Sequence, residues 1–355
     1  MLKEFYKNKK VLVTGHTGFK GSWLSKILLN WGADVVGLAL EPSTTPNLFK
    51  ELGIGSDIHN YFCDIRNFNQ VKEIFLKQKP EIIFHLAAQP IVRDSYDDPL
   101  RTFETNIMGT ANVLHAIKET SGIRAGVIIT TDKVYENKDD GNFYTENDRL
   151  GGYDPYSSSK AGAEIVISSY IKSFFNPLNH GESHQTLIAS ARSGNVIGGG
   201  DWAKDRIITD IVRAIFEKDE EIIIRNPLSI RPWQHVLEPL NGYLLLAKGL
   251  FESKKDLSGA WNFGPNPENC LSVENLVERV IKILGRGKHI VQEDKTKHET
   301  QVLRLNSDKA KNNLGWQPML DPVQTLNLTF DWYQNFYNKK NMIDITNQQI
   351  ALFFN

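Results

Sequence analysis

The sequence predicts an α/β protein built on a doubly wound parallel sheet, with a smaller α/β part towards its C-terminus. Short apolar runs alternate with segments of helical periodicity over the first 190 residues, as they do when helices cover both faces of a parallel sheet. The first apolar run, KVLVT, leads directly into a glycine-rich turn and an apolar helix. The remainder is less regular. We therefore expect one domain over 1–190 and a second mainly over 191–355, with some strand and helix exchange back to the first.

Each expected element is limited by a start or stop signal. In the first domain the expected strands are 10–14, 34–40, 58–63, 82–86, 127–130 and 187–192. The expected helices there are one that follows Gly21 and runs through about Trp31, and those over 68–79, 99–120 and 155–175. The last helix has the strongest start, because Asp154 can cap it and Pro155 suits its first position. In the second domain we expect helices near 207–216, 239–251 and 273–283 and strands near 222–225, 261–263 and 289–291.

Composition argues against several classes of protein. Hydrophobic residues make up 41% of the chain and charged residues 23%, which is ordinary for a globular protein. With a net charge of −1, nothing favours binding to nucleic acid or to an anionic membrane. Cys63 and Cys270 form no metal-binding spacing and no disulfide framework, so we expect no metal. The first residues, MLKEFYKNKK, lead directly into a strand, and without a signal peptide or a long apolar span we expect a cytoplasmic protein.

Three glycines, Gly15, Gly18 and Gly21, follow the first expected strand. Alone the pattern is weak, because a strand-to-helix turn often needs glycine for its shape. Between a strand and a helix it is typical of a Rossmann fold, where glycine lets backbone N–H groups approach a pyrophosphate. We therefore predict a dinucleotide site, whose loop residues are Gly15, His16, Thr17, Gly18, Phe19, Lys20 and Gly21.

His16 and Lys20 are unusual in such a loop. They are either solvated at the surface or in contact with phosphate or sugar hydroxyls. At the end of the second expected strand, Glu41 stands one step beyond the position from which an acid binds the adenosine ribose. No arginine follows that would suit a 2′-phosphate, which favours NAD over NADP.

Two further turns could contact the dinucleotide. Asp64 and Ile65 follow the third expected strand, where the carboxylate could accept from the amino group of adenine or simply form a strand-end turn. The small residues after the fourth strand suit a close passage of the dinucleotide but are also common in tight turns; they are Leu86, Ala87 and Ala88.

Tyr156 and Lys160 stand one helical turn apart and share a face of the helix that Asp154 begins. A phenol titrates near pH 10, too high for a base at neutral pH, but a neighbouring ammonium stabilises the phenolate. The YxxxK pattern is frequent by chance. It becomes specific here because it follows the glycine loop, with Thr131 at the end of the strand between them.

Polar residues elsewhere extend this constellation. Asp132 and Lys133 follow Thr131, either as a solvated turn or as an acid and an amine for proton transfers beyond simple alcohol oxidation. The second half carries a cluster of basic residues: Arg206, Arg225, Arg231 and His235. A random surface patch would explain such a cluster, but arginine in a capping domain also suits a diphosphate, which it binds with two parallel hydrogen bonds.

Several motifs together resemble the CDP-glucose 4,6-dehydratases, a group within the extended short-chain dehydrogenase/reductase family. They are TGHTGFKG, HLAAQPIVRDSY, TFETNIMGT, TTDKVYEN, GGYDPYSSSK, SGNVIGGGDWAKDR and RPWQHVLEP, and the resemblance covers about residues 5 to 340. It implies a tightly held NAD, bound by the loop and strand-end residues already named and also by Gln89, Thr105, Thr130, Tyr156 and Lys160. It further implies that Asn195, Arg206, Ile207, Arg231 and His235 bind the nucleotide sugar.

The same resemblance implies the chemistry. CDP-glucose is oxidised at C4, loses water across C5 and C6, and receives the hydride back at C6, in the synthesis of deoxysugar precursors of O-antigen-type polysaccharides. Tyr156 takes the C4 hydroxyl proton with the help of Thr131 and Lys160, and Asp132 protonates the leaving C6 hydroxyl. Where related enzymes have a glutamate as the C5 base, this chain has Lys133, which must be neutral to act.

Three alternatives remain open. A 4-epimerase of the same fold would need neither Asp132 nor Lys133, and a dehydratase could act on another nucleotide sugar. A catalytically silent NAD-binding sensor would tolerate loss of Tyr156 or Lys160, and both are present. The resemblance also implies a homodimer in which the helices near 99–120 and 155–175 form a four-helix bundle; their alternative role is packing on the sheet.

Overall fold

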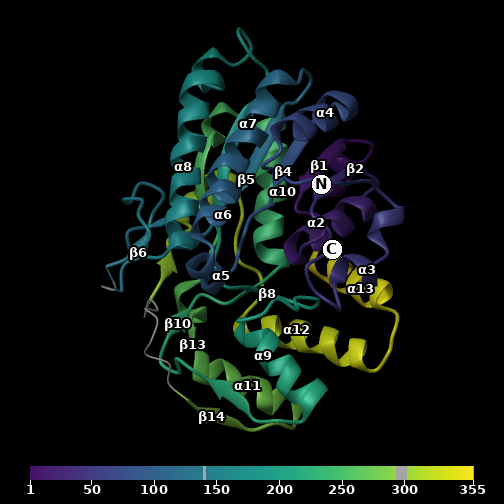
Figure 1. Cartoon of the computed structure of the whole chain (residues 1–355), viewed down its shortest axis with the longest axis vertical. Coiled ribbons are helices and arrows are strands. Elements are labelled where there is room, and N and C mark those ends of the chain that lie inside the picture. Colours follow the sequence, from purple (N-terminus) through teal and green to yellow (C-terminus); the bar gives the residue numbers. More distant parts are fainter. Residues whose placement is uncertain (139–140, 293–301, 355) are drawn as a thin grey trace.

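The computed structural model describes residues 1–138, 141–292 and 302–354. At its centre lies a seven-stranded parallel sheet in the order β12-β7-β5-β4-β1-β2-β3 (Figure 1). Its strands are β1 (Lys10–Thr14), β2 (Asp34–Ala39), β3 (His59–Phe62), β4 (Ile82–His85), β5 (Ala125–Ile129), β7 (Leu187–Arg192) and β12 (Gly259–Asn262). The strand order reverses between β1 and β4, as in a doubly wound fold, and the predicted fold class is confirmed.

The sheet separates two hydrophobic cores, because successive residues of a strand point to opposite faces. Within β1, Val13 enters one core and Leu12 the other. The first core is covered by α2 (Phe19–Asn30) and α10 (Leu237–Phe251). The second is covered by α4 (Phe68–Gln78), α7 (Gly109–Glu119) and α8 (Pro155–Phe174). Since α10 and β12 both lie beyond residue 190, the second half of the chain completes the main sheet and its cover.

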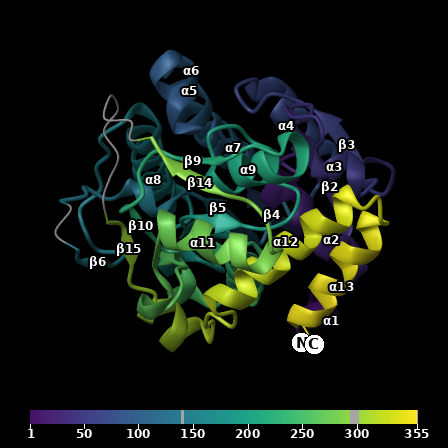
Figure 2. The same cartoon turned by 90° about the horizontal axis from the view of Figure 1, so that it is seen from below.

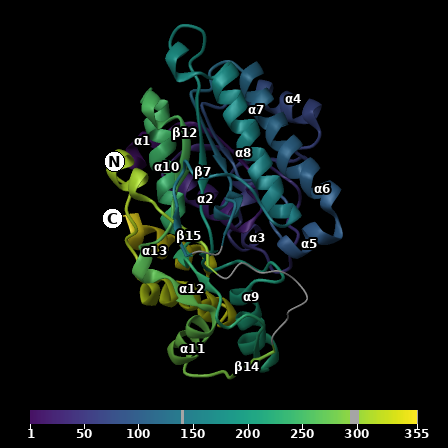
Figure 3. The same ribbon diagram turned by 90° about the vertical axis from the view of Figure 1, so that its left-hand side faces the viewer.

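The second half otherwise forms short strands and helices that gather at one end of the molecule (Figure 3). Its paired strands are β8 (Val196–Ile197) with β11 (Gln234–His235), β9 (Ile222–Ile224) with β14 (His289–Val291), and β10 (Ile230–Arg231) with β13 (Leu271–Ser272). A further pair joins the halves: β6 (Phe143–Tyr144) with β15 (Arg304–Leu305). The helices there include α9 (Ile207–Val212), continued by a π-helical turn η5 (Arg213–Lys218), and α11 (Val273–Leu284).

Four helices differ from the expectation or were not expected. The N-terminal residues do not run directly into a strand but form α1 (Leu2–Tyr6), because the Tyr6 hydroxyl donates to the carbonyl of Leu244 and anchors the segment on α10. Two C-terminal helices, α12 (Pro322–Tyr337) and α13 (Met342–Phe354), had not been predicted, nor had α5 (Val92–Asp97). The end of α13 packs near the start of the chain, so the two termini lie close together (Figure 2).

The expected helix over 99–120 is present but contains an irregular turn. It consists of α6 (Pro99–Phe103), a π-helical turn η2 (Glu104–Met108) and α7. The wider turn lets the side chain of Asn106 reach inwards, where it donates to the carbonyl of Gln89 and the hydroxyl of Ser159. The remaining short helices are α3 (Leu48–Glu51), η1 (Ile54–Ser56), η3 (Asp132–Val134), η4 (Pro177–Asn179), η6 (Lys255–Leu257), η7 (Pro267–Asn269) and η8 (Ala310–Leu314). Across the described ranges, no helix is long and apolar enough to cross a membrane.

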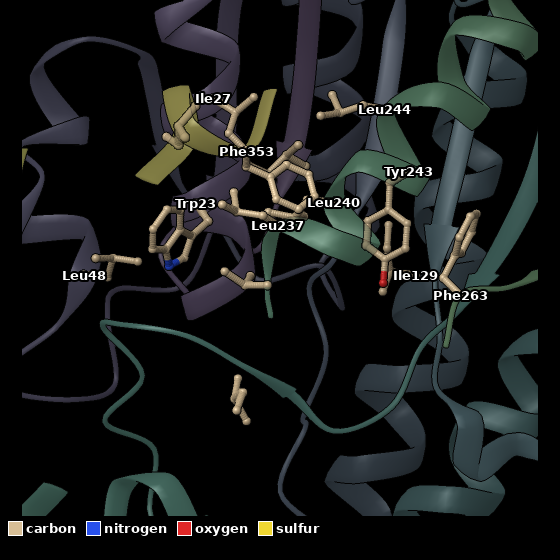
Figure 4. Packing of buried hydrophobic residues seen from close by; sticks show 14 of the residues in the cluster. Trp23, Ile27, Leu48, Ile129, Leu237, Leu240, Tyr243, Leu244, Phe263 and Phe353 are labelled. Carbon is tan, nitrogen blue, oxygen red and sulfur yellow. The ribbon is translucent and has the colours of Figure 1, made fainter. Parts of the chain in front are cut away.

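The two halves share a core beside the sheet. Figure 4 shows Trp23 of α2 and Phe353 of α13 packed with Leu237 and Leu240 of α10. The Trp23 indole donates to the carbonyl of Gly199, in the loop that follows β8. On the other side of this loop lies Trp332 of α12, so close that a Cβ on Gly199 would meet its ring. The core therefore holds the 197–202 loop from two sides.

Trp332→Ala should lower the free energy of unfolding by about 3–5 kcal/mol, because it removes a fully buried indole that packs on this loop. Val323→Ala, on the same helix, removes a side chain that is 47% exposed and should change this energy by less than about 0.5 kcal/mol. Urea unfolding followed by circular dichroism measures both. Equal losses for the two variants would contradict the assignment of Trp332 to the shared core.

Candidate active site

A cavity of about 810 Å³ lies between the carboxyl ends of the sheet and the second half of the chain. Its walls come from the glycine loop, the end of β5, the start of α8, the segment after β7 and the start of α9. Ligands of open α/β sheets bind at this edge, where the strand order reverses. The predicted site residues that line it are Phe19, Lys20, Thr130, Thr131, Asp132, Lys133, Tyr156, Asn195, Arg206, Ile207 and Arg231.

The end of β5 forms a tight turn that presents three polar side chains. Thr131 caps the 3₁₀ turn η3, its hydroxyl accepting from the backbone N–H of Lys133 at 3.4 Å. The same hydroxyl donates to Asp132 at 3.0 Å. Asp132 is buried and Lys133 half-buried in the cavity wall, so the alternative of a solvated Asp-Lys turn is wrong for Asp132.

The surroundings of the Asp132 carboxyl group favour its protonated form. One of its oxygens, Oδ2, has no hydrogen-bond partner among the described residues. Burial raises its pKa, and the opposing influences of Lys133, Thr131, Arg231 and Lys20 do not cancel this. Gly194 makes room for the group, since a Cβ there would overlap the carboxylate. A buried carboxyl with a raised pKa keeps its proton to a higher pH and can donate it.

Tyr156 faces the same turn from the first turn of α8, which Asp154 caps through the backbone N–H of Ser157 as predicted. Burial raises the pKa of Tyr156 to about 12; a hydrogen bond with Thr131 and the charge of Arg206 act in the opposite direction. The Lys160 ammonium donates to the carbonyl of Ile129 at 3.0 Å. Lys160 is not among the groups that shift the pKa of Tyr156 here, so the expectation that it lowers this pKa stays a prediction.

The glycine loop has the shape of a phosphate cradle. Gly15 adopts φ +75°, and a Cβ there would lie 2.7 Å from the backbone nitrogen of Ala87. A Cβ on Gly21 would lie 2.0 Å from the carbonyl oxygen of Gly15, whereas one on Gly18 would have 3.4 Å. Gly18 is the N-cap of α2 and offers no side-chain cap, so the first N–H groups of the helix are open to an anion. These residues fit a dinucleotide pyrophosphate.

His16 occupies a place that the sequence did not indicate. The imidazole is fully buried above Gly37 and is hydrogen-bonded to Asn60 at 2.7 Å, so neither surface solvation nor a direct phosphate contact describes it in this structure. Burial lowers its pKa to about 4, which makes the ring neutral at physiological pH. The neighbouring Thr17 hydroxyl donates to the carbonyl of Leu40 and fixes the loop on β2.

Lys20 projects into the cavity, next to Ser193. Its ammonium lies 3.4 Å from the hydroxyl of Ser193 and is not solvated at the surface as one alternative proposed. Burial lowers its pKa to about 7, helped by the charges of Arg206 and Lys160 and opposed by Asp132. A lysine in this environment is easily neutralised when another cation approaches.

The strand ends on the far side of the loop hold the other predicted cofactor residues. The Arg66 guanidinium donates hydrogen bonds to the Asp64 carboxylate, which keeps the pKa of Asp64 below its ordinary value. The adjacent Ile65 is buried. Leu86 and Ala88 flank Ala87, whose N–H donates to the Thr14 hydroxyl. Thr105 belongs to the π-helical turn η2.

Gln89 follows Ala88, and its backbone N–H and carbonyl are both hydrogen-bonded to the side chain of Asn106. Asn106, one residue after Thr105, is the side chain that joins this region to α8. Sequence reasoning missed it, although a buried asparagine within an apolar helical face was a visible signal.

Most of the predicted substrate residues in the second half lie in the cavity wall, but His235 does not. Its imidazole is fully buried against Trp23, and burial lowers its pKa to about 3. The prediction that His235 contacts the substrate is therefore not supported, because β11 points this side chain into the core. Arg206 reaches the cavity and forms an ion pair with Asp201, and Arg231 is buried in the wall.

Gly18→Ala should weaken dinucleotide binding without changing the fold of the loop. The added methyl group has room, so the free energy of unfolding should change by less than about 1 kcal/mol. It would stand where a pyrophosphate must approach the backbone, so dinucleotide affinity should fall by at least about tenfold. Gly21→Ala is the contrast, because its Cβ cannot be accommodated and the loop itself must shift. Thermal unfolding and calorimetric titration with NAD measure the two effects; unchanged NAD affinity in Gly18→Ala would contradict the assignment.

Comparison with known proteins agrees with this geometry. Residues 12–327 match the model of the family described as GDP-mannose 4,6 dehydratase. The chain is 45% identical over 350 residues to the CDP-glucose 4,6-dehydratase of Salmonella typhimurium, covering 98% of this chain and 97% of that protein. The dTDP-D-glucose 4,6-dehydratase of Mus musculus is 27% identical over 94% of this chain and 91% of its own length.

Solved structures show the same fold. The dTDP-glucose 4,6-dehydratase of Bacillus anthracis, crystallised in complex with NAD, superposes with a TM-score of 0.78 at 23% identity, covering 94% of this chain and 99% of that one. The matches extend over nearly the whole chain, from the glycine loop to the second-half residues of the cavity. The protein belongs to the GDP-mannose 4,6 dehydratase family.

Proposed function

We propose that this protein is a CDP-glucose 4,6-dehydratase with NAD as a tightly bound cofactor. The observation that carries the proposal is the pairing of Asp132 and Lys133 with Tyr156 in one cavity, next to a glycine loop shaped for a dinucleotide. The relative from Salmonella typhimurium, named for this activity, aligns over nearly the full length of both chains. The similarity to this relative supports CDP as the nucleotide.

The residues for the cofactor belong mainly to 1–190, and those for the nucleotide sugar mainly to 191–355. Backbone N–H groups at the start of α2 would hold the pyrophosphate, Asp64 and Ile65 the adenine, and Lys160 the ribose of nicotinamide. When bound, NAD would supply the acceptor for the hydride from C4 of the sugar and the donor that returns it to C6. The reaction as a whole loses water and leaves the cofactor in its original oxidation state.

The oxidation half of the reaction needs a base at the C4 hydroxyl. Tyr156 would remove this proton, and the Thr131 hydroxyl, already in contact with the phenol, would hold the C4 oxygen. Burial disfavours the phenolate. The nearby positive charges of Lys160 and Arg206, and of the bound cofactor, would therefore have to stabilise it.

The elimination half needs a base at C5 and an acid at C6. The C4 ketone acidifies the C5 hydrogen, which the Lys133 amine would remove, while Asp132 would give its proton to the departing C6 oxygen. The raised pKa of Asp132 and its unpaired Oδ2 support this role. A 4-epimerase needs neither step, so the burial of Asp132 in the cavity wall favours a dehydratase.

The second half would grip the diphosphate of the substrate. Arg206 and Arg231 line the cavity as cations, together with Asn195 and Ile207. Guanidinium groups bind phosphates with two parallel hydrogen bonds, which suits a substrate carrying two negative charges.

We also propose a homodimer. Large apolar side chains are exposed on the surface of α6, η2 and α8, at Leu100, Met108 and Ile165. The helical segment formed by α6, η2 and α7, together with α8, would form a four-helix bundle with its copy, which would cover this surface. Because NAD and nucleotide sugars are cytoplasmic metabolites, we propose a cytoplasmic enzyme that supplies precursors of deoxysugars and O-antigen-type polysaccharides.

Incubation with CDP-glucose should yield a 4-keto-6-deoxy sugar nucleotide, detected by its absorbance after treatment with base. The turnover number with the dTDP, UDP and GDP sugars should be at least about tenfold lower, since each differs in the base that the protein must recognise. Mass spectrometry should show the loss of one water. A product from another nucleotide sugar, with none from CDP-glucose, would overturn the proposed substrate.

Asp132→Asn and Lys133→Met should each lower kcat by about 10²–10⁴-fold, because each removes a proton-transfer group. In deuterated water, Asp132→Asn should still exchange the C5 hydrogen of the bound sugar, whereas Lys133→Met should not. Lys138→Met changes an exposed lysine nearby and should leave both quantities unaltered. Exchange and turnover that persist in Lys133→Met would exclude Lys133 as the C5 base.

A further inference from the structure

A charged pair is buried directly beneath the proposed reaction centre. Glu164 stands one helical turn after Lys160 on α8, and Arg192 ends β7; their side chains are each 4% exposed. The carboxylate accepts two hydrogen bonds from Arg192, at 3.0 and 2.9 Å. It accepts two more, from the hydroxyl of Thr130 at 2.5 Å and that of Ser190 at 2.8 Å.

The guanidinium group is equally well bound. It donates to the hydroxyl of Tyr135 at 2.7 Å and to the carbonyl of Glu146. The Tyr135 hydroxyl in turn donates to Asn262 of β12. Replacing a buried ion pair by well-packed apolar residues of similar volume often leaves the free energy of unfolding unchanged or raises it. Stability alone therefore does not explain why both members of this pair have so many hydrogen bonds.

Its neighbours are the residues proposed to react. Thr130, which Glu164 binds, is adjacent to Thr131, and the Lys160 ammonium is held by the carbonyl of Ile129, on the same strand end. Ser193 follows Arg192 and contacts Lys20. The pair is thus hydrogen-bonded to the end of β5 through Thr130 and to β7 through Ser190, next to residues that line the cavity.

Within the pair, Glu164 is the group that acts on Lys160. The other titratable groups that interact with this ammonium are Lys20 on α2 and His85 on β4, whereas Arg192 on β7 is bound to the carboxylate of Glu164. Burial lowers the pKa of Lys160 to about 8, and Glu164 acts against this; the pKa of His85, lowered to about 3 by burial, leaves that ring neutral. Burial opposes ionisation of Glu164, yet Arg192 and the two hydroxyl groups hold its pKa below the ordinary value.

We propose that Glu164, held by Arg192, is a positioning residue for the proposed reaction: it keeps Lys160 charged and holds Thr130, and with it the Thr131–Asp132 turn, in register with α8. The inference rests on the proposed function, since it assigns Lys160 a role that needs its positive charge. Glu164 does not touch the substrate and acts through Lys160 and Thr130.

The test is the pH dependence of three variants. In Glu164→Gln the carboxylate is lost, so Lys160 should lose its proton at a lower pH, and the alkaline limb of the kcat profile should move down by about one pH unit. KM for CDP-glucose should stay within about twofold. Glu164→Asp retains the charge and should restore the position of the limb, and Ser190→Ala removes one hydrogen bond to the same carboxylate and should not move it.

A purely structural role would give a different pattern. Glu164→Gln and Glu164→Asp would then lower kcat by the same factor, and the alkaline limb of the kcat profile would stay at the pH of the wild-type protein. This result would overturn the proposal. If Glu164→Gln does not fold, the double variant Glu164→Gln with Arg192→Met removes both charges; because Glu164 and not Arg192 acts on the Lys160 ammonium, the limb should still move to lower pH. An unmoved limb in that folded double variant would also overturn it.

A second readout does not depend on turnover. The ε-carbon resonance of Lys160, in protein carrying isotope-labelled lysine and assigned through its loss in Lys160→Met, reports the proton on that amine directly. Its titration should move to lower pH in Glu164→Gln and remain in place in Ser190→Ala. Should no nucleotide sugar be turned over by the wild-type protein, the proposed function fails, while this titration still decides whether Glu164 controls the charge of Lys160.

Discussion

The site depends on the docking of the first turns of α8 onto the end of β5. The cap at Asp154 begins the helix, and the bonds from Lys160 to Ile129 and from Thr130 to Glu164 fasten it to the strand. With both elements fixed, the phenol of Tyr156 can only face the turn that Thr131 caps. The distances that matter for proton transfer are thus set by secondary structure and buried hydrogen bonds, and a ligand does not have to organise them.

The cavity carries charges of both signs. Its basic side chains include Arg206 and Arg231, and its carboxyl groups include Asp132, Asp201 and Asp205. The two guanidinium groups favour a diphosphate and the ionised form of a sugar hydroxyl. They also disfavour the positive charge of an oxidised nicotinamide. A tight fit of the backbone around the pyrophosphate can offset this, because those contacts are independent of the charge on the ring.

The sheet and the start of α8 could be predicted because their signals are local: buried strands are continuous apolar runs, and Asp154 with Pro155 is a strong helix start. The burial of His16 and His235 could not, since it depends on Gly37 and Trp23, which are distant in sequence. For α12 a signal was present and overlooked, because Asp321 and Gln324 form a capping box before it. The role of Glu164 needs the strands that surround it, which no single-residue pattern reveals.

The pairing of β12 with β7 has a consequence for how the protein is made. While the chain is being synthesised, the first six strands of the sheet emerge well before Gly259, and β7 remains an open edge whose flank lacks α10. An apolar edge of this kind can pair with another chain. Residues 1–190 alone would therefore leave β7 as an unpaired edge strand until β12 pairs with it and α10 covers its flank.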